Sequence, residues 1–178
     1  MSIVRLHRDV TAEDGVRLFE YREAWVEPEG GAFVVHHGRV GAVGTVGEQP
    51  VASEEEGEEL LAAFLEQGRE EGFAEVDEDA FATVVVAYRL RGREATGIER
   101  RHGETLRGEI THQLAWRGLG QVTDVAEGDG VLELTVRTPH AAKASAEVPV
   151  AAKRAHGIQP NKVEVRTTTP ARAVDGEA

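Results

Sequence analysis

The chain has 178 residues, of which 40% are hydrophobic and 29% are charged, and it contains no cysteine. This length suffices for one large or two small domains with a real core, and the composition excludes a wholly disordered chain. The lack of cysteine excludes disulfide bonds, thiolate catalysis and cysteine-ligated zinc. No apolar stretch approaches the length of a membrane span and the first residues do not form a secretory signal, so we expect a cytoplasmic protein without a membrane partner.

The net charge of −12 is unevenly distributed along the chain. Residues 1–80 contain 20 acidic residues and 6 arginines, a net charge of −14, whereas residues 81–178 contain 12 acidic and 14 basic residues, a net charge of +2. Such an asymmetry indicates two units with different surfaces. We therefore expect one domain at residues 1–79, a second at residues 80–169 and a disordered tail at residues 170–178.

The first half has the pattern of several strands followed by one helix. Alternating or β-branched residues predict strands at residues 18–22, 32–37 and 40–44. A helix is expected to begin after Ser53, whose hydroxyl can cap its first turn, and to end at Gly72. Four apolar residues recur at helical spacing and are expected to form its buried face: Leu60, Leu61, Phe64 and Leu65.

The second half alternates strands with helices. In chain order, the pattern predicts a central strand at residues 81–90, a loop at 91–103, a helix at 104–117, a hairpin of strands at 122–126 and 131–138, a helix after Thr138 and a final strand at 163–165. We expect Pro149 to kink or divide the second of these helices. The order β-α-β-β-α-β is that of a ferredoxin-like sandwich, so the predicted fold class is α+β.

Three segments of the first half occur in the order and spacing of a known module. They are Arg17-Leu18-Phe19-Glu20-Tyr21, the run Phe33-Val34-Val35-His36-His37-Gly38-Arg39-Val40-Gly41-Ala42-Val43-Gly44, and Gly72-Phe73 after the helix. With these motifs, residues 15–77 resemble the WGR domain, which is found in DNA-break-sensing poly(ADP-ribose) polymerases and in small bacterial proteins. The resemblance implies an antiparallel sheet with one helix, and a regulatory or nucleic-acid-associated role.

The DNA-binding positions of WGR domains can be followed in this sequence. The family's signature tryptophan is replaced by His37, and Arg39 stands at its signature arginine. The resemblance implies that the aromatic residue packs on the terminal sugar and base while basic residues hold the 5′ phosphate. It therefore makes His37 and Arg39 candidate nucleic-acid-binding residues. The helix positions that are commonly basic in the family include Glu66 and Glu70 here, and acidic side chains repel phosphate.

Residues 53–79 form the most acidic segment, with 12 acidic residues and one basic residue, Arg69. A charge run of this kind is typically a solvated helix face that confers solubility. The alternative is a face that engages a basic protein. The candidate partner-binding residues of that face are Glu55, Glu59, Glu66 and Glu70.

Six arginines cluster between residues 89 and 107, together with three glutamates. Arginine favours bidentate contacts to phosphate or carboxylate groups. The cluster could therefore bind nucleic acid, with Arg100 and Arg101 as the candidate residues. It could also meet the acidic helix of its own chain, or that of a second copy in a homo-oligomer.

No arrangement of residues predicts catalysis, a cofactor or a metal site. The chain has three serines, none in a G-x-S-x-G motif, and it has no phosphate-binding G-x-x-x-x-G-K-[ST] loop. His36 and His37 are neighbours on a predicted strand and point to opposite faces, so we expect one partly buried and one exposed imidazole. We therefore expect a non-catalytic binding protein with a nucleic-acid-associated or regulatory role. The alternative is an acidic protein-interaction module that engages a basic partner and does not bind DNA.

Overall fold

The computed structural model describes residues 3–27, 31–76 and 80–169, and the expected tail at 170–178 lies outside these residues. The chain divides into two compact units, Met1–Val76 and Asp77–Ala178, which we call unit 1 and unit 2. Each unit is built on its own antiparallel sheet with helices, so the fold is α+β, as predicted. Within the described residues, none of the helices combines the length and the apolar composition that crossing a membrane requires.

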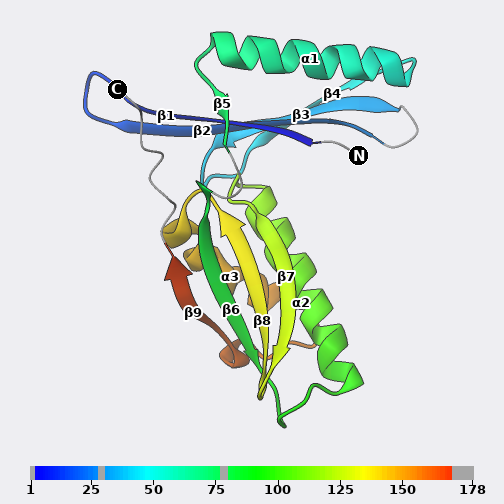
Figure 1. Ribbon diagram of the computed structural model, residues 1–178, viewed down its shortest axis with the longest axis vertical. Helices are drawn as coiled ribbons and strands as arrows, with labels where there is room; N and C mark the ends of the chain where they lie inside the picture. Colours follow the sequence, from blue (N-terminus) through cyan, green and yellow to red (C-terminus); the bar gives the residue numbers. More distant parts are fainter. Residues whose placement is uncertain (1–2, 28–30, 77–79, 170–178) are drawn as a thin grey trace. The chain divides into compact units, whose positions relative to one another are not determined.

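Unit 1 is a five-stranded sheet with one long helix on one face (Figure 1). Its elements are β1 (Ile3–Thr11), β2 (Arg17–Val26), β3 (Ala32–Arg39), β4 (Thr45–Pro50), α1 (Glu54–Glu70) and β5 (Ala74–Glu75). The strand order is β4-β3-β2-β1-β5, and every pair is antiparallel. Helix α1 packs mainly on β2 and less on β1 and β3, while β4 is an edge strand.

Two features of this sheet differ from the prediction. Residues 40–44, expected as a strand, belong to the turn before β4, and β1 is not predicted at all. Strand β1 lacks a continuous apolar stripe because polar residues interrupt both of its faces: Arg8 lies between Leu6 and Val10 on one face, and Arg5, His7 and Asp9 follow Ile3 on the other. It is held by cross-strand ion pairs, from Arg5 to Glu23 at 3.1 Å and from Arg8 to Glu20 at 2.6 Å. Hydrophobic periodicity does not reveal such pairs.

Helix α1 begins and ends where the sequence predicts. The Ser53 hydroxyl accepts a hydrogen bond from the backbone N–H of Glu56 at 3.1 Å, which caps the first turn. At the other end Gly72 has a φ of 83°, and the N–H of Phe73 donates to the carbonyl of Gly68 at 2.9 Å. This is a Schellman ending, and it buries the Phe73 ring after the helix.

The inner face of α1 is the predicted one, since Leu60, Leu61 and Phe64 pack against the core of unit 1, and the fully buried residues of this face are Gly57 and Gly68. A Cβ atom at Gly57 would lie 2.8 Å from a methyl group of Val26, and one at Gly68 would overlap Leu6. The two glycines therefore let the helix approach the sheet closely. The four residues expected to form the buried face are only partly buried beside this contact: Leu60, Leu61, Phe64 and Leu65.

Unit 2 is a four-stranded sheet with two helices packed on it. Its elements are β6 (Ala82–Arg89), α2 (Gly97–Ala115), β7 (Gln121–Gly128), β8 (Val131–Thr138), α3 (Ala141–Arg154), the 3-10 turn η2 (Pro160–Lys162) and β9 (Val163–Thr169). The sheet order β7-β8-β6-β9 is antiparallel throughout, and β6 is a central strand as predicted. The element order is β-α-β-β-α-β, as predicted. The predicted apolar face of α2 is confirmed, since three of its residues have no exposed surface: Leu106, Ile110 and Leu114.

Helix α2 begins at Gly97, so most of the segment expected as a loop up to residue 103 is helical. Thr96 caps it, and Glu99 completes a capping box by accepting from the Thr96 hydroxyl at 2.7 Å and from the Thr96 N–H at 3.1 Å. These bonds, and one from the N–H of Arg91, lower the pKa of Glu99 to about 2. The pattern Thr96-x-x-Glu99 is visible in the sequence and marks this start.

Helix α3 is a single helix with Pro149 inside it, so the prediction that this proline divides the helix is wrong. Pro149 is exposed, whereas its neighbour Val148 is buried together with Ala151 and Ala152. Packing of this face on the sheet outweighs the backbone hydrogen bond that proline cannot make. The N-cap is also shifted, because His140 rather than Thr138 accepts the bond from the N–H of Lys143.

Candidate binding site beside helix α1

The four carboxylates expected to bind a partner lie on the face of α1 that points away from the sheet. Glu55, Glu59, Glu66 and Glu70 are all exposed. At about 100° per residue they fall within about 60° of one another around the helix axis. The buried Gly57 and Gly68 mark the opposite side, which packs on the sheet. We call these four side chains the acidic face.

The acidic face is not neutralised by the arginines of unit 1. Within the described residues, none of its four carboxylates has a hydrogen bond or ion pair with another side chain. In contrast, five of the six arginines of this unit form ion pairs elsewhere: Arg5–Glu23, Arg8–Glu20, Arg17–Asp9, Arg22–Glu71 and Arg69–Glu75. The acidic face is therefore uncompensated and available to an external ligand.

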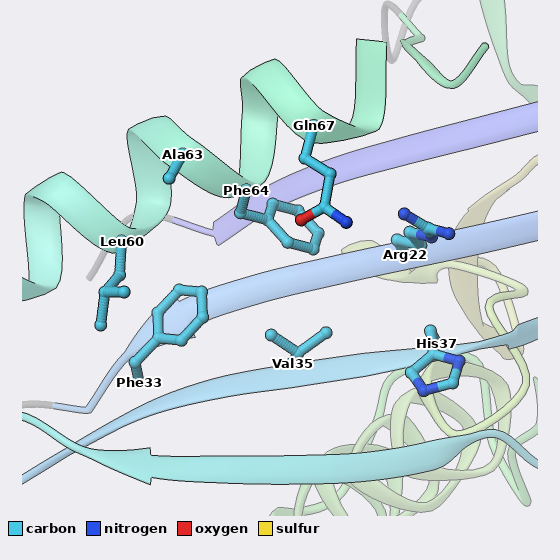
Figure 2. Close-up of a pocket in the computed structure, with 8 residues that line it drawn as sticks. All are labelled: Arg22, Phe33, Val35, His37, Leu60, Ala63, Phe64 and Gln67. Atoms are coloured by element: carbon cyan, nitrogen blue, oxygen red, sulfur yellow. The ribbon is translucent and has the colours of Figure 1, made fainter. Parts of the chain in front are cut away.

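An apolar groove of about 340 Å³ runs beside the helix, between α1 and β3 (Figure 2). Its lining residues are Arg22, Phe33, Val35, His37, Leu60, Ala63, Phe64 and Gln67. Helix α1 packs more on β2 than on β3, and the groove lies between the helix and β3. Phe33, Val35 and His37 of β3 pair with three residues of the edge strand β4. These are Gln49, Gly47 and Thr45, which are too small or too polar to fill the groove.

The groove borders directly on the acidic face. Ala63 on the helix wall lies four residues after Glu59 and three residues before Glu66, so these side chains are neighbours on the helix surface. Gln67, also on the wall, is three residues before Glu70. A ligand seated in the groove would consequently meet carboxylates along its helix-side lip.

The other end of the groove is polar. His37 pairs with Arg22 across β3 and β2, and both side chains line this end (Figure 2). The Arg22 guanidinium forms an ion pair with Glu71 and lies 4.3 Å from the centre of the Phe73 ring. Its hydrogen bond lowers the pKa of the Glu71 carboxyl, with a smaller contribution from Gln67. Arg22 is therefore already compensated, while His37 is exposed.

The four candidate nucleic-acid-binding residues are divided between the units. His37 and Arg39 lie two residues apart on β3, on one face of the sheet, and Arg39 is exposed. Arg100 and Arg101 lie on α2 of unit 2, in a helix rather than in the expected loop. Arg100 forms an ion pair with Glu127 at 3.1 Å.

Two further arginines of the predicted cluster are also paired inside unit 2. Arg93 contacts Asp129 at 2.9 Å, and Arg107 contacts Glu104 at 3.4 Å. The predicted cluster is therefore partly compensated by carboxylates of its own unit.

A buried polar chain on the opposite face of the sheet was not predicted from the sequence. The Tyr21 hydroxyl lies 2.9 Å from Nε2 of His36, whose Nδ1 lies 3.3 Å from a Glu23 oxygen; Arg5 donates to the other oxygen of Glu23 at 3.1 Å. His36 is 5% exposed, which confirms that one imidazole of the pair is buried and the other exposed. A Cβ at Gly44 would overlap Tyr21 and His36, so the glycine motif serves close packing of this turn.

No protein-family model, no curated protein and no solved structure matches the chain. The WGR resemblance therefore stays a prediction carried by the motifs alone. What the protein binds must be inferred from its own surface, where the acidic face and the adjoining groove stand out.

Proposed function

We propose that this is a non-catalytic binding protein whose unit 1 recognises a basic segment of another protein. The observation that carries the proposal is the acidic face, four exposed carboxylates on one side of α1 that no described arginine compensates. A surface of one sign steers a partner of the opposite sign and disfavours partners of its own sign. The absence of cysteine agrees with a cytoplasmic location, which forms part of the proposal.

Nucleic-acid binding, which the WGR resemblance implies, is the second candidate. The exposure of His37 and Arg39 on one face of β3 favours it. However, binding to a phosphate backbone is driven by several cations that replace counterions. Arg39 is the one arginine in the described part of unit 1 without an ion pair, and residues 1–80 carry a net charge of −14. The electrostatics therefore favour a basic protein segment.

Competition between two probes tests this choice. Full-length protein is titrated with a fluorescent lysine-rich peptide and with a 5′-phosphorylated DNA duplex, at about 50 mM and about 200 mM salt. We expect the peptide to bind and to weaken as salt rises, and the duplex to show no comparable affinity. Tighter binding of the duplex than of the peptide would contradict the proposal.

A matched pair of variants assigns the surface. The triple variant Glu59→Gln, Glu66→Gln and Glu70→Gln removes three charges from the acidic face and should abolish most of the peptide affinity. The control, Glu13→Gln, Glu48→Gln and Glu94→Gln, removes three exposed charges from elsewhere and changes the net charge equally. Equal loss of affinity in both variants would show that net charge, not the acidic face, attracts the peptide.

A further inference from the structure

The groove beside α1 combines apolar walls with an acidic lip. Resting on the proposed function, we propose that it is an anchor site that takes one aromatic side chain of the basic segment. In this arrangement the lysines or arginines of the partner lie on the acidic face, and the aromatic residue between them enters the groove. The groove would thus add selectivity to an attraction that charge alone leaves unspecific.

The walls of the groove suit an aromatic ring. Phe33 and Phe64 face each other edge to face, with ring centres 6.4 Å apart and an interplanar angle of 71°. Val35 and Leu60 extend the apolar surface, and both are only partly buried (Figure 2). A third ring can join such a pair in stacked or edge-to-face geometry and bury a large area of its own. The volume of about 340 Å³ lies within the range of pockets that hold small organic groups.

The lip of the groove indicates the charge of the occupant. Glu59 and Glu66 flank Ala63 on the helix wall, so a phosphate or carboxylate entering here would meet two uncompensated negative charges. At the polar end, the charge of Arg22 is already compensated by its ion pair with Glu71. A cationic segment with an aromatic residue would pack its ring on the apolar walls and place its positive charges beside Glu59 and Glu66. An anionic ligand with the same ring would pack on the walls but be repelled by these carboxylates.

Two peptides that differ at one position test the anchor. Both are short and lysine-rich; one carries a central tryptophan, the other an alanine, and each is titrated by calorimetry into the full-length protein. We expect the tryptophan peptide to bind about tenfold more tightly or better. Ala63→Gln should erase this advantage because the longer side chain occupies the groove. Ala62→Gln, at the next exposed position outside the groove, should preserve it.

The outcomes separate the anchor from the proposed function. Equal affinity of the two peptides, or equal effects of Ala63→Gln and Ala62→Gln, would contradict the proposal of an aromatic anchor site. Neither result would contradict the proposal that the acidic face binds a basic segment. A tryptophan advantage that survives without any effect of the Glu59, Glu66 and Glu70 substitutions would support the groove and contradict the role of the acidic face.

A charge-free probe tests the groove even if neither peptide binds. N-acetyl-tryptophanamide is titrated into the full-length protein while the methyl NMR signals of Val35 and Leu60 are followed. Saturable shifts of these signals support the anchor, and their absence overturns it. Shifts that depend on protein concentration before any probe is added would identify a second copy of the chain as the occupant, and would equally overturn it.

Discussion

In unit 2, two helices pack on a four-stranded sheet, whereas in unit 1 a single helix packs on a five-stranded sheet. The apolar residues of α2, Leu106, Ile110 and Leu114, have no exposed surface. On α1 the fully buried residues are two glycines, and Leu60 and Phe64 remain partly exposed. Unit 2 thus buries its helix-facing apolar side chains in its own core, while unit 1 leaves some of them accessible beside the helix.

This difference in how the helices pack on the two sheets indicates where a binding surface can form in a small protein. A helix that contacts a sheet through glycines lies close to the sheet but covers few of its strands. Apolar side chains on a neighbouring strand can then remain partly exposed. In unit 1 that strand is β3, where Phe33 is buried and Val35 is only partly buried. Partly exposed apolar side chains next to uncompensated charge are typical of interaction surfaces. The candidate site therefore lies at the edge of the core of unit 1, against which Val35, Leu60 and Phe64 pack.

The largest expected effect is in the closed core of unit 2. Ile110→Ala should destabilise that unit by about 3–4 kcal/mol, because the removed side chain is fully buried. The measurement is urea unfolding followed by the fluorescence of Trp116, in a Trp25→Phe background that removes the other tryptophan. A cost below about 1 kcal/mol would contradict the difference between the two units.

Acidification should weaken unit 1 by up to about 3 kcal/mol. Burial lowers the pKa of His7 from 6.5 to about 4; Glu23 opposes this shift and Arg5 adds to it. Between these two pH values His7 is protonated in the unfolded chain but neutral in the folded chain. The free energy of unfolding therefore falls as pH drops from about 6.5 towards 4. Urea unfolding monitored by Trp25 should show this loss, and His7→Gln should flatten it. An identical pH profile in the variant would contradict the assignment.

Two glycine substitutions should have opposite signs. Gly68→Ala places a methyl group against Leu6 and should destabilise unit 1 by about 1–3 kcal/mol. Gly108→Ala on α2 has open space around the new methyl group and should stabilise unit 2 by about 0.5–1 kcal/mol. Thermal unfolding of both variants is the check. A stabilising effect of Gly68→Ala would mean that α1 does not depend on this close approach.

The smallest expected loss of stability is at the wall of the groove. Phe64→Ala should cost only about 1–2 kcal/mol, less than a fully buried phenylalanine would, because its ring is partly exposed. The same urea titration with Trp25 as the probe measures it. A cost of about 4 kcal/mol would show that the ring belongs to the closed core and that the groove is shallower than described.

Much of this architecture can be read from the sequence where local signals agree with packing. The cap at Ser53, the glycine ending at Gly72 and the apolar face of α2 are all found as predicted. The prediction is wrong where distant contacts decide: β1 is held by ion pairs to β2, and Pro149 is tolerated because its helix packs on the sheet.

The candidate site is only half visible in the sequence. The periodic spacing of Glu55, Glu59, Glu66 and Glu70 predicts an acidic face, and the structure places all four side chains on the exposed side of α1. The groove could not be predicted, since it depends on how far α1 reaches across the sheet. That reach depends on the close approach of Gly57 to Val26 and of Gly68 to Leu6, whereas helical periodicity shows only which residues face the core, Leu60 and Leu61 among them.

The most direct test of the account is an NMR titration of the full-length, ¹⁵N-labelled protein with the lysine-rich peptide that carries one tryptophan. The account predicts that the largest shifts of backbone signals occur at Glu59, Ala63 and Glu66 on α1 and at Val35 on β3, while the signals of α2 stay in place. Shifts centred on Arg100 and Arg101, or no shifts at all, would contradict the claim that the partly covered face of unit 1 is the binding surface.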